Sequence, residues 1–153
     1  NGKVNDWYFH GKNFDVPGTI LGGERRWILD LGRVEVMAEV AVNGKPLGLL
    51  WKPPYRVDAT DAIKAGGNEL EIKVVNLWPN RMIGDEQLPE DSERNPDGTL
   101  KSWPEWLQAG KPSPTGRHTF TSWRLWKKDA RCLDSGLLGP VTLQPAGVAV
   151  VSP

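Results

Sequence analysis

The feature that most constrains the fold is an alternating segment near the middle of the chain. Residues 69–74 read Glu-Leu-Glu-Ile-Lys-Val, which places Leu70, Ile72 and Val74 on one face and charged residues on the other. A period of two residues is typical of a β-strand that has one face on a core and one face in water. The segment therefore predicts a half-buried strand, and with it a sheet that packs against a second layer.

Other segments show strand character and are separated by turn signals. The chain has 17 Gly and 13 Pro among its 153 residues, a share that predicts many turns and hence many short strands. The strongest turn signal is Asn43-Gly44, because both residues accept the positive φ of a type I′ hairpin. We predict further strands at residues 4–14, 27–31, 34–42, 46–51, 55–58, 119–126, 141–144 and 148–151, a helical turn at 60–65, and a turn at 135–140.

These elements together predict an all-β fold in a single domain, residues 1–153. Many short strands with almost no helical periodicity indicate an antiparallel β-sandwich or barrel, and the length suits one domain. Residues 77–118 are polar, rich in Pro and without strand alternation. We predict that they form a long inserted loop, which in a compact domain is usually functional or poorly ordered.

Charge and cysteine content exclude several classes of function. The 19 basic and 19 acidic residues cancel, which argues against a nucleic-acid or anionic-membrane partner. No run of 18 apolar residues is present, so we expect no membrane-spanning segment. The single cysteine, Cys132, excludes an internal disulfide and any zinc site built from several cysteines.

Tryptophan is unusually frequent, with eight Trp beside two Tyr and three Phe. A flat indole ring can stack on the C–H face of a sugar at low entropic cost. The alternative is that the indoles fill the core, which we expect at strand positions such as Trp27 and Trp123. Six of them are candidate sugar platforms, Trp51, Trp78, Trp103, Trp106, Trp123 and Trp126, and we take the first four as candidate ligand-binding residues.

Four polar residues follow the alternating strand, close to Trp78 in the sequence: Asn80, Arg81, Asp85 and Glu86. Amides, guanidinium groups and carboxylates recognise vicinal hydroxyls, so these residues are candidate sugar ligands. The alternative is an ion pair between Arg81 and Asp85 that fixes the loop. Acid–base hydrolysis by Asp85 and Glu86 is disfavoured, because sequence neighbours rarely face each other across a sugar at about 5–9 Å.

Several stretches resemble modules of large sugar hydrolases. Residues 31–48, with the Asn43-Gly44 hairpin, are similar to galactose-binding-like β-sandwiches attached to glycoside hydrolases. A more specific resemblance is to the C-terminal β-sandwich of large bacterial α-L-rhamnosidases. It is carried by residues 51–58 (WKPPYRVD), 75–85 (VNLWPNRMIGD), 117–121 (RHTFT) and 135–141 (SGLLGPV).

This resemblance implies a jelly-roll, galactose-binding-domain-like sandwich appended to a separate catalytic barrel. It also implies that this chain holds no catalytic residue and that the protein is extracellular or periplasmic in a bacterium. Such modules often carry a structural calcium ion. Oxygen ligands from Asp58, Asp61 and carbonyls near Gly66 are conceivable here.

We therefore predict a monomeric, non-catalytic carbohydrate-binding module. It would tether a glycoside hydrolase to plant polysaccharide through stacked tryptophans and polar loop residues. The alternative is a structural accessory sandwich that packs against the catalytic barrel without binding sugar itself.

Overall fold

A computed structural model describes residues 7–23, 25–147 and 149. These residues divide into two compact units. The first, called here the sandwich unit, comprises the described residues up to 77 and from 135 onward. The second, called the inserted unit, comprises residues 78–134. The predicted loop at 77–118 thus falls almost entirely within a compact unit that continues for a further 16 residues, to 134.

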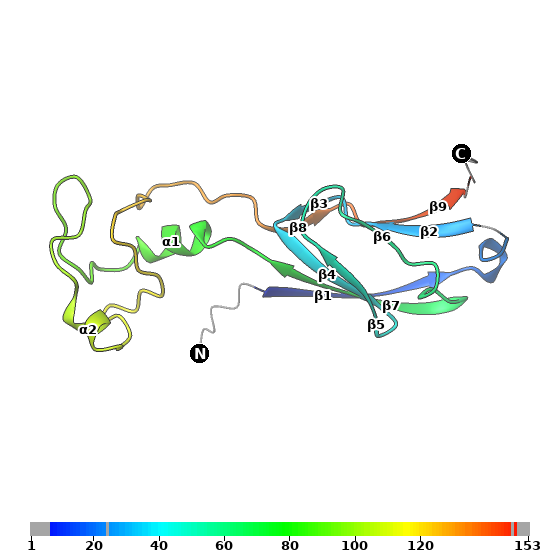
Figure 1. Ribbon diagram of the computed structural model, residues 1–153, viewed down its shortest axis with the longest axis horizontal. Helices are drawn as coiled ribbons and strands as arrows, with labels where there is room; N and C mark the ends of the chain where they lie inside the picture. The colour runs from blue at the N-terminus through cyan, green and yellow to red at the C-terminus, as the bar shows by residue number, and fades with distance from the viewer. Residues whose placement is uncertain (1–6, 24, 148, 150–153) are drawn as a thin grey trace, which may run out of the picture. The chain divides into compact units, whose positions relative to one another are not determined.

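Antiparallel sheets build the sandwich unit (Figure 1). The first sheet has the order β1 (Trp7–Val16), β7 (Gly66–Val75), β4 (Met37–Val42) and β5 (Lys45–Leu50). The second sheet has the order β6 (Arg56–Asp58), β2 (Arg25–Asp30) and β9 (Thr142–Gly147). A short ribbon pairs β3 (Arg33–Glu35) with β8 (Gly136–Gly139), and a 3-10 turn, η1 (Gly18–Ile20), follows β1.

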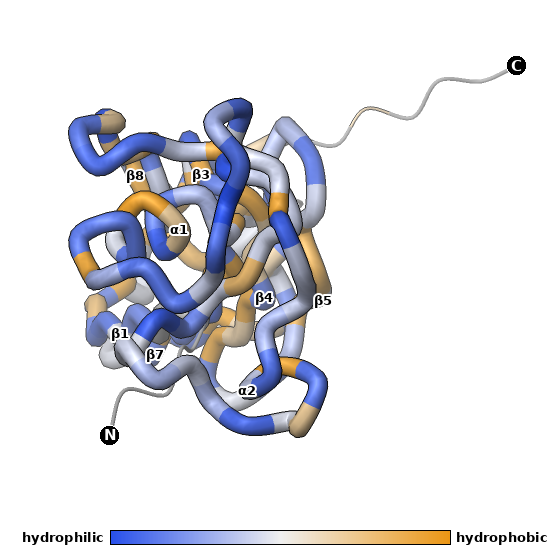
Figure 2. Tube along the Cα trace, turned by 90° about the vertical axis from the view of Figure 1, so that its left-hand side faces the viewer, coloured by the Kyte–Doolittle hydropathy of each residue, from blue (hydrophilic) through white to orange (hydrophobic). Residues whose placement is uncertain are grey.

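The core of the sandwich unit is made by the inward residues of these sheets. Leu70, Ile72 and Val74 of β7 are buried, as the alternation predicts, and they belong to one cluster with Leu29 and Val40. Hydrophobic residues group along the strands in Figure 2, whereas the loops are largely hydrophilic. The predicted all-β antiparallel sandwich is confirmed.

Some predicted boundaries differ from the structure. The predicted strand at 34–42 is divided into β3 and β4, and the predicted turn at 135–140 contains β8. The helical turn predicted at 60–65 is a single turn, in which the N–H groups of Ala62 and Ile63 donate to the carbonyl of Ala59. Part of the strand predicted at 148–151, like residues 4–6 of the first predicted strand, lies outside the described residues.

The strand predicted at 119–126 is wrong. Its residues are apolar and β-branched enough for a strand, yet they form irregular chain with one isolated bridge, between Thr99 and Trp123. In the described part of the chain the segment pairs only with residues 98–100, where the N–H of Arg124 donates to the carbonyl of Gly98 and the N–H of Leu100 donates to the carbonyl of Ser122. At its start the N–H of Thr119 donates to the carboxylate of Asp85 and not to a strand.

The inserted unit contains two short helices that the sequence did not suggest. Helix α1 (Pro79–Asp85) has Pro79 in its first turn, where a missing N–H costs nothing. Helix α2 (Glu105–Gln108) follows Pro104. Both are too short for an apolar period to show in the sequence. No helix in the described part of the chain has the length and hydropathy needed to cross a membrane.

Gly32 provides a test of the packing in the sandwich unit. Its φ is +65°, and a methyl group there would lie 2.5 Å from the carbonyl carbon and oxygen of Gly139. Gly32→Ala should lower the free energy of unfolding by about 3 kcal/mol, because left-handed strain and overpacking add. The matched control, Gly44→Ala, has φ +75° with no atom within 4 Å of the added methyl group. It should cost only about 1 kcal/mol. If urea denaturation showed the same loss of unfolding free energy in Gly32→Ala and Gly44→Ala, the close contact between Gly32 and Gly139 would be contradicted.

Candidate functional site

Three of the four candidate tryptophans present their rings to solvent. Trp51 directly follows β5 in the sandwich unit and is 61% exposed, with Lys52 Nζ 5.0 Å from the centroid of its ring. Trp78 precedes α1 and is 41% exposed. Trp103 is 58% exposed, although its ring also contacts Phe120, with 5.8 Å between the ring centroids. These three side chains are therefore accessible to solvent.

Trp106 has a different role. Its Nε1 donates to the carbonyl of Asp91 at 2.8 Å, and its ring packs edge-on against Phe120 with 5.8 Å between centroids. The structure therefore brings Trp103 and Trp106 together on Phe120. Trp106 thus links residue 91 to Phe120 within the inserted unit.

Asp85 is buried and lies at the centre of the inserted unit. Its Oδ2 accepts from the N–H of His118 at 2.9 Å, the N–H of Thr119 at 2.7 Å and the hydroxyl of Thr119 at 2.8 Å. Its Oδ1 accepts no hydrogen bond but lies 3.3 Å from a guanidinium nitrogen of Arg81. The carboxylate thus joins the end of α1 to residues 118–119, and the ion pair considered as an alternative to sugar binding is present.

Glu86 and Asn80 also have protein partners. Glu86 Oε1 accepts from Arg117 at 3.1 Å, and its Oε2 lies 3.6 Å from Nε of Arg124. The amide of Asn80 donates to the carbonyl of Leu133 at 2.8 Å and accepts from its N–H at 2.7 Å. Sugar binding by these polar residues stays a prediction, but their hydrogen-bonding groups are already engaged in holding the inserted unit together.

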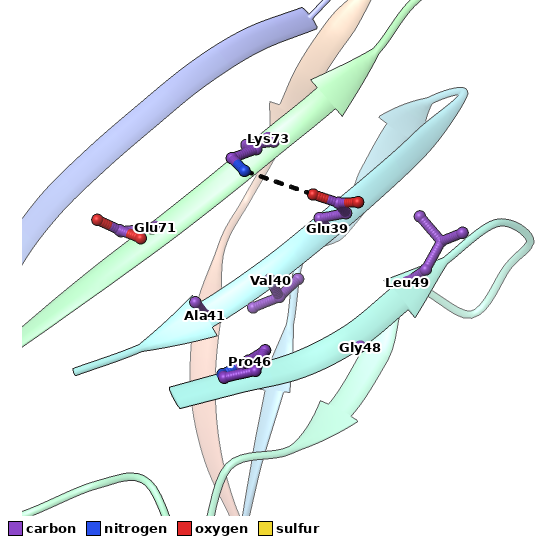
Figure 3. A pocket seen from close by; sticks show the side chains of 8 residues that line it. All are labelled: Glu39, Val40, Ala41, Pro46, Gly48, Leu49, Glu71 and Lys73. Carbon is purple, nitrogen blue, oxygen red and sulfur yellow. Dashed lines mark ion pairs between the residues drawn. The ribbon is translucent and has the colours of Figure 1, made fainter. Parts of the chain in front are cut away.

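A groove that the sequence did not indicate lies on the outer face of the first sheet. Its volume is about 350 Å³. We call it the outer groove. Figure 3 shows the residues that line it: Glu39, Val40, Ala41, Pro46, Gly48, Leu49, Glu71 and Lys73. The alternation at 69–74 predicts that Glu71 and Lys73 point outward, but nothing in the sequence predicts a hollow beside them.

A second cavity, mainly apolar, opens between the two sheets of the sandwich unit and has a volume of about 490 Å³. We call it the edge pocket. Its lining includes Phe14 of β1, Leu70 and Ile72 of β7, and Leu143 of β9. Among the described strands, β1 pairs only with β7 and β9 only with β2, so both flanking strands are sheet edges.

The surroundings of Asp58 do not favour calcium binding by Asp58, Asp61 and the carbonyls near Gly66. Asp58 Oδ1 accepts from the N–H and hydroxyl of Thr60, and Oδ2 accepts from Arg26 at 2.5 Å. A guanidinium group and two further donors leave this carboxylate little capacity to bind a cation. The described residues also contain no group of three or more His, Cys, Asp or Glu side chains placed to hold a metal ion. A structural calcium ion stays a family-based prediction.

The contacts of Asp85 generate a prediction for the inserted unit. Asp85→Asn should destabilise that unit by about 3 kcal/mol, since it removes a buried charge from its guanidinium partner. The exposed Asp97→Asn, which also loses a carboxylate that accepts from Thr99, should have a much smaller effect, because solvent screens this group. Trypsin cleavage within 78–134 reports the difference. Cleavage of Asp85→Asn at the wild-type rate would contradict the assigned role.

The contacts of Asp58 predict a dependence of stability on pH. The hydroxyl and N–H of Thr60, followed by the guanidinium of Arg26, lower the pKa of Asp58 to about 2. Because the unfolded pKa is about 3.9, the ionised group stabilises the fold above pH 4 and loses this effect as the pH falls toward 2. Asp58→Asn should flatten this part of the profile by up to about 1 kcal/mol after solvent screening. Asp61→Asn, in the same loop, serves as the control, and an unchanged profile in Asp58→Asn would contradict the assignment.

Comparison with known proteins places this chain beside large glycoside hydrolases. No protein-family model matches it. It is 50% identical over 141 residues to a protein of Formosa agariphila described as "Putative beta-glucuronidase", covering 89% of this chain and 12% of that protein. It is 35% identical to the solved rhamnosidase of Novosphingobium sp. PP1Y, with a TM-score of 0.65, covering 90% of this chain and 10% of that enzyme.

The chain thus spans about a tenth of the length of each relative. The predicted resemblance is confirmed at this level: the chain is similar to a module-sized segment of large glycoside hydrolases.

Proposed function

We propose that this chain is a non-catalytic accessory module of a large glycoside hydrolase, and that it packs against the rest of that enzyme through the edge pocket of its sandwich. The similarity to a tenth of two such proteins supports the first part of the proposal. The substrate of the parent enzyme is left open by this proposal, because the two relatives carry different activity names.

The carboxylates of the described residues support a non-catalytic role. Glycoside hydrolysis needs two carboxyl groups across a bound sugar, one of them an acid with a raised pKa. Asp85 and Glu86 are adjacent at the end of α1, and each is held by protein donors. Hydrogen-bond donors lower the pKa of three described carboxyls, those of Asp30, Asp58 and Asp97, which is the opposite of the shift that a catalytic acid needs.

The observation that carries the packing role is the edge pocket. An apolar hollow between two sheet edges is a surface that a soluble protein normally covers. An apolar loop or strand of a neighbouring domain has the chemistry to fill it, and edge strands β1 and β9 offer free backbone groups for pairing. This is the behaviour expected of a structural accessory sandwich.

Exposed indoles support a second candidate function, carbohydrate binding that tethers the enzyme to plant polysaccharide. Trp51, Trp78 and Trp103 are exposed to solvent, as a stacking platform requires. Tethering would raise the local concentration of substrate at an extracellular or periplasmic enzyme. Retention of the chain in a polysaccharide gel, lost in Trp103→Ala but kept in Val141→Glu, would favour this candidate.

A charge at the rim of the edge pocket tests the packing proposal. Val141 lines the pocket and is exposed in the isolated module, whereas Leu138, also exposed, does not line it. In the parent hydrolase, Val141→Glu should lower the melting temperature of the module by several degrees, because a buried charge loses its solvation. In the isolated chain the same change should have little effect. Equal shifts for Val141→Glu and Leu138→Glu in the parent enzyme would overturn the proposal.

A further inference from the structure

The outer groove on the first sheet has the composition of a small-ligand site. It lies on the outward face of β4, β5 and β7, away from the core, and all its lining residues come from the sandwich unit (Figure 3). We propose that it binds a neutral pyranose. The edge pocket and the exposed tryptophans take no part in this site, so it can be tested whether or not the module packs on a hydrolase.

The hollow exists because the pairing of β4 with β5 is irregular. Val40 pairs with Gly48 and Ala41 with Pro46, so Leu47 is an extra residue on β5. Gly48 has φ +123°, and a side chain there would meet no atom within 4 Å. The floor of the groove is therefore bare backbone at Gly48 and a single methyl group at Ala41. A ligand can lie directly on the sheet at this point.

The two sides of the groove differ in polarity. Pro46 and Leu49 form an apolar side, and Leu49 is half exposed. The other side carries Glu39, Glu71 and Lys73, in which Lys73 Nζ lies 3.6 Å from Oε2 of Glu39. A pyranose matches this arrangement, because its C–H face suits apolar contacts while its hydroxyls suit charged hydrogen-bonding groups.

Glu71 is the group most available to a ligand. Among the described residues its carboxylate has no hydrogen bond or ion pair, in contrast to that of Glu39. Its partner on β1 is Gly11, so no side chain of that cross-strand neighbour covers it. A free carboxylate can accept two hydrogen bonds from vicinal hydroxyls of one sugar ring.

Charge and size define the class of ligand. Two carboxylates and one ammonium leave one net negative charge, which repels a uronic acid and favours a neutral sugar. A volume of about 350 Å³ is at the lower end for ligand pockets, which suits one or two sugar rings.

Matched neutral and acidic sugars test this class directly. We would titrate the ¹⁵N-labelled chain with the methyl glycosides of glucose, galactose and rhamnose, and with glucuronate and galacturonate. At least one neutral glycoside should shift the amides of Ala41, Gly48 and Lys73, and the acid should bind at least about fivefold more weakly than its neutral counterpart. Silence with every neutral glycoside, or equal binding of the acids, would overturn the proposal.

Variants then assign the binding to the groove. Ala41→Leu, which fills the floor, should abolish the shifts, and Glu71→Gln should weaken binding about tenfold. The control Glu69→Gln changes the same outward face of β7 outside the groove and should have no effect. Trp103→Ala should also leave binding unchanged. Loss of binding in Trp103→Ala, or full binding in a folded Ala41→Leu and in Glu71→Gln, would overturn the proposal.

Discussion

The strict alternation of β7 is the constraint on which the sandwich unit depends. Its inward residues, including Leu70 and Val74, belong to the core, and its outward residues, including Glu71 and Lys73, line the charged side of the outer groove. A shift of register by one residue would exchange these faces. The same strand thus determines both how the sheets pack and what chemistry the outer surface offers.

Buried Asn68 holds the start of this strand in register. Its side-chain amide donates to the carbonyls of Lys64 and Gly66, and its oxygen accepts from the N–H of Lys64 and from the amide of Asn43. Asn43 is the first residue of the hairpin turn between β4 and β5. The turn that closes the hairpin is therefore tied by hydrogen bonds to the strand beside it, and the buried polar group is satisfied.

The inserted unit is stabilised differently. Within residues 78–134 only Ile83 and Asp85 are buried, so this unit has no extended apolar core. Ionic and polar cross-links replace one: Asp85 joins α1 to residues 118–119, while Arg117 and Arg124 bridge Glu86 and Glu90. Such contacts hold a long polar segment in place although few apolar side chains are buried. Replacing any one of these charged residues leaves its partner without a counter-charge.

The sequence predicted the sandwich, whereas the outer groove and the long-range contacts of the inserted unit could not be predicted from it, for physical reasons. Alternation and the Asn43-Gly44 turn are local signals, so β7 and the β4–β5 hairpin followed from them. The hydrogen-bond donors to Asp85 are His118 and Thr119, more than 30 residues away, and no local pattern indicates that the N–H of Thr119 serves this carboxylate and not a strand. The outer groove depends on an extra residue at Leu47, an irregularity of pairing that residue types do not encode.

We propose that this chain supplies surfaces and not reacting groups: the edge pocket, the exposed indoles and the outer groove. The most direct test of that account is a glycosidase assay of the isolated chain on aryl α-L-rhamnoside and aryl β-D-glucuronide. The account predicts no turnover above that of buffer at any pH at which the chain is folded. Turnover that is lost in Glu71→Gln or Asp85→Asn would contradict it.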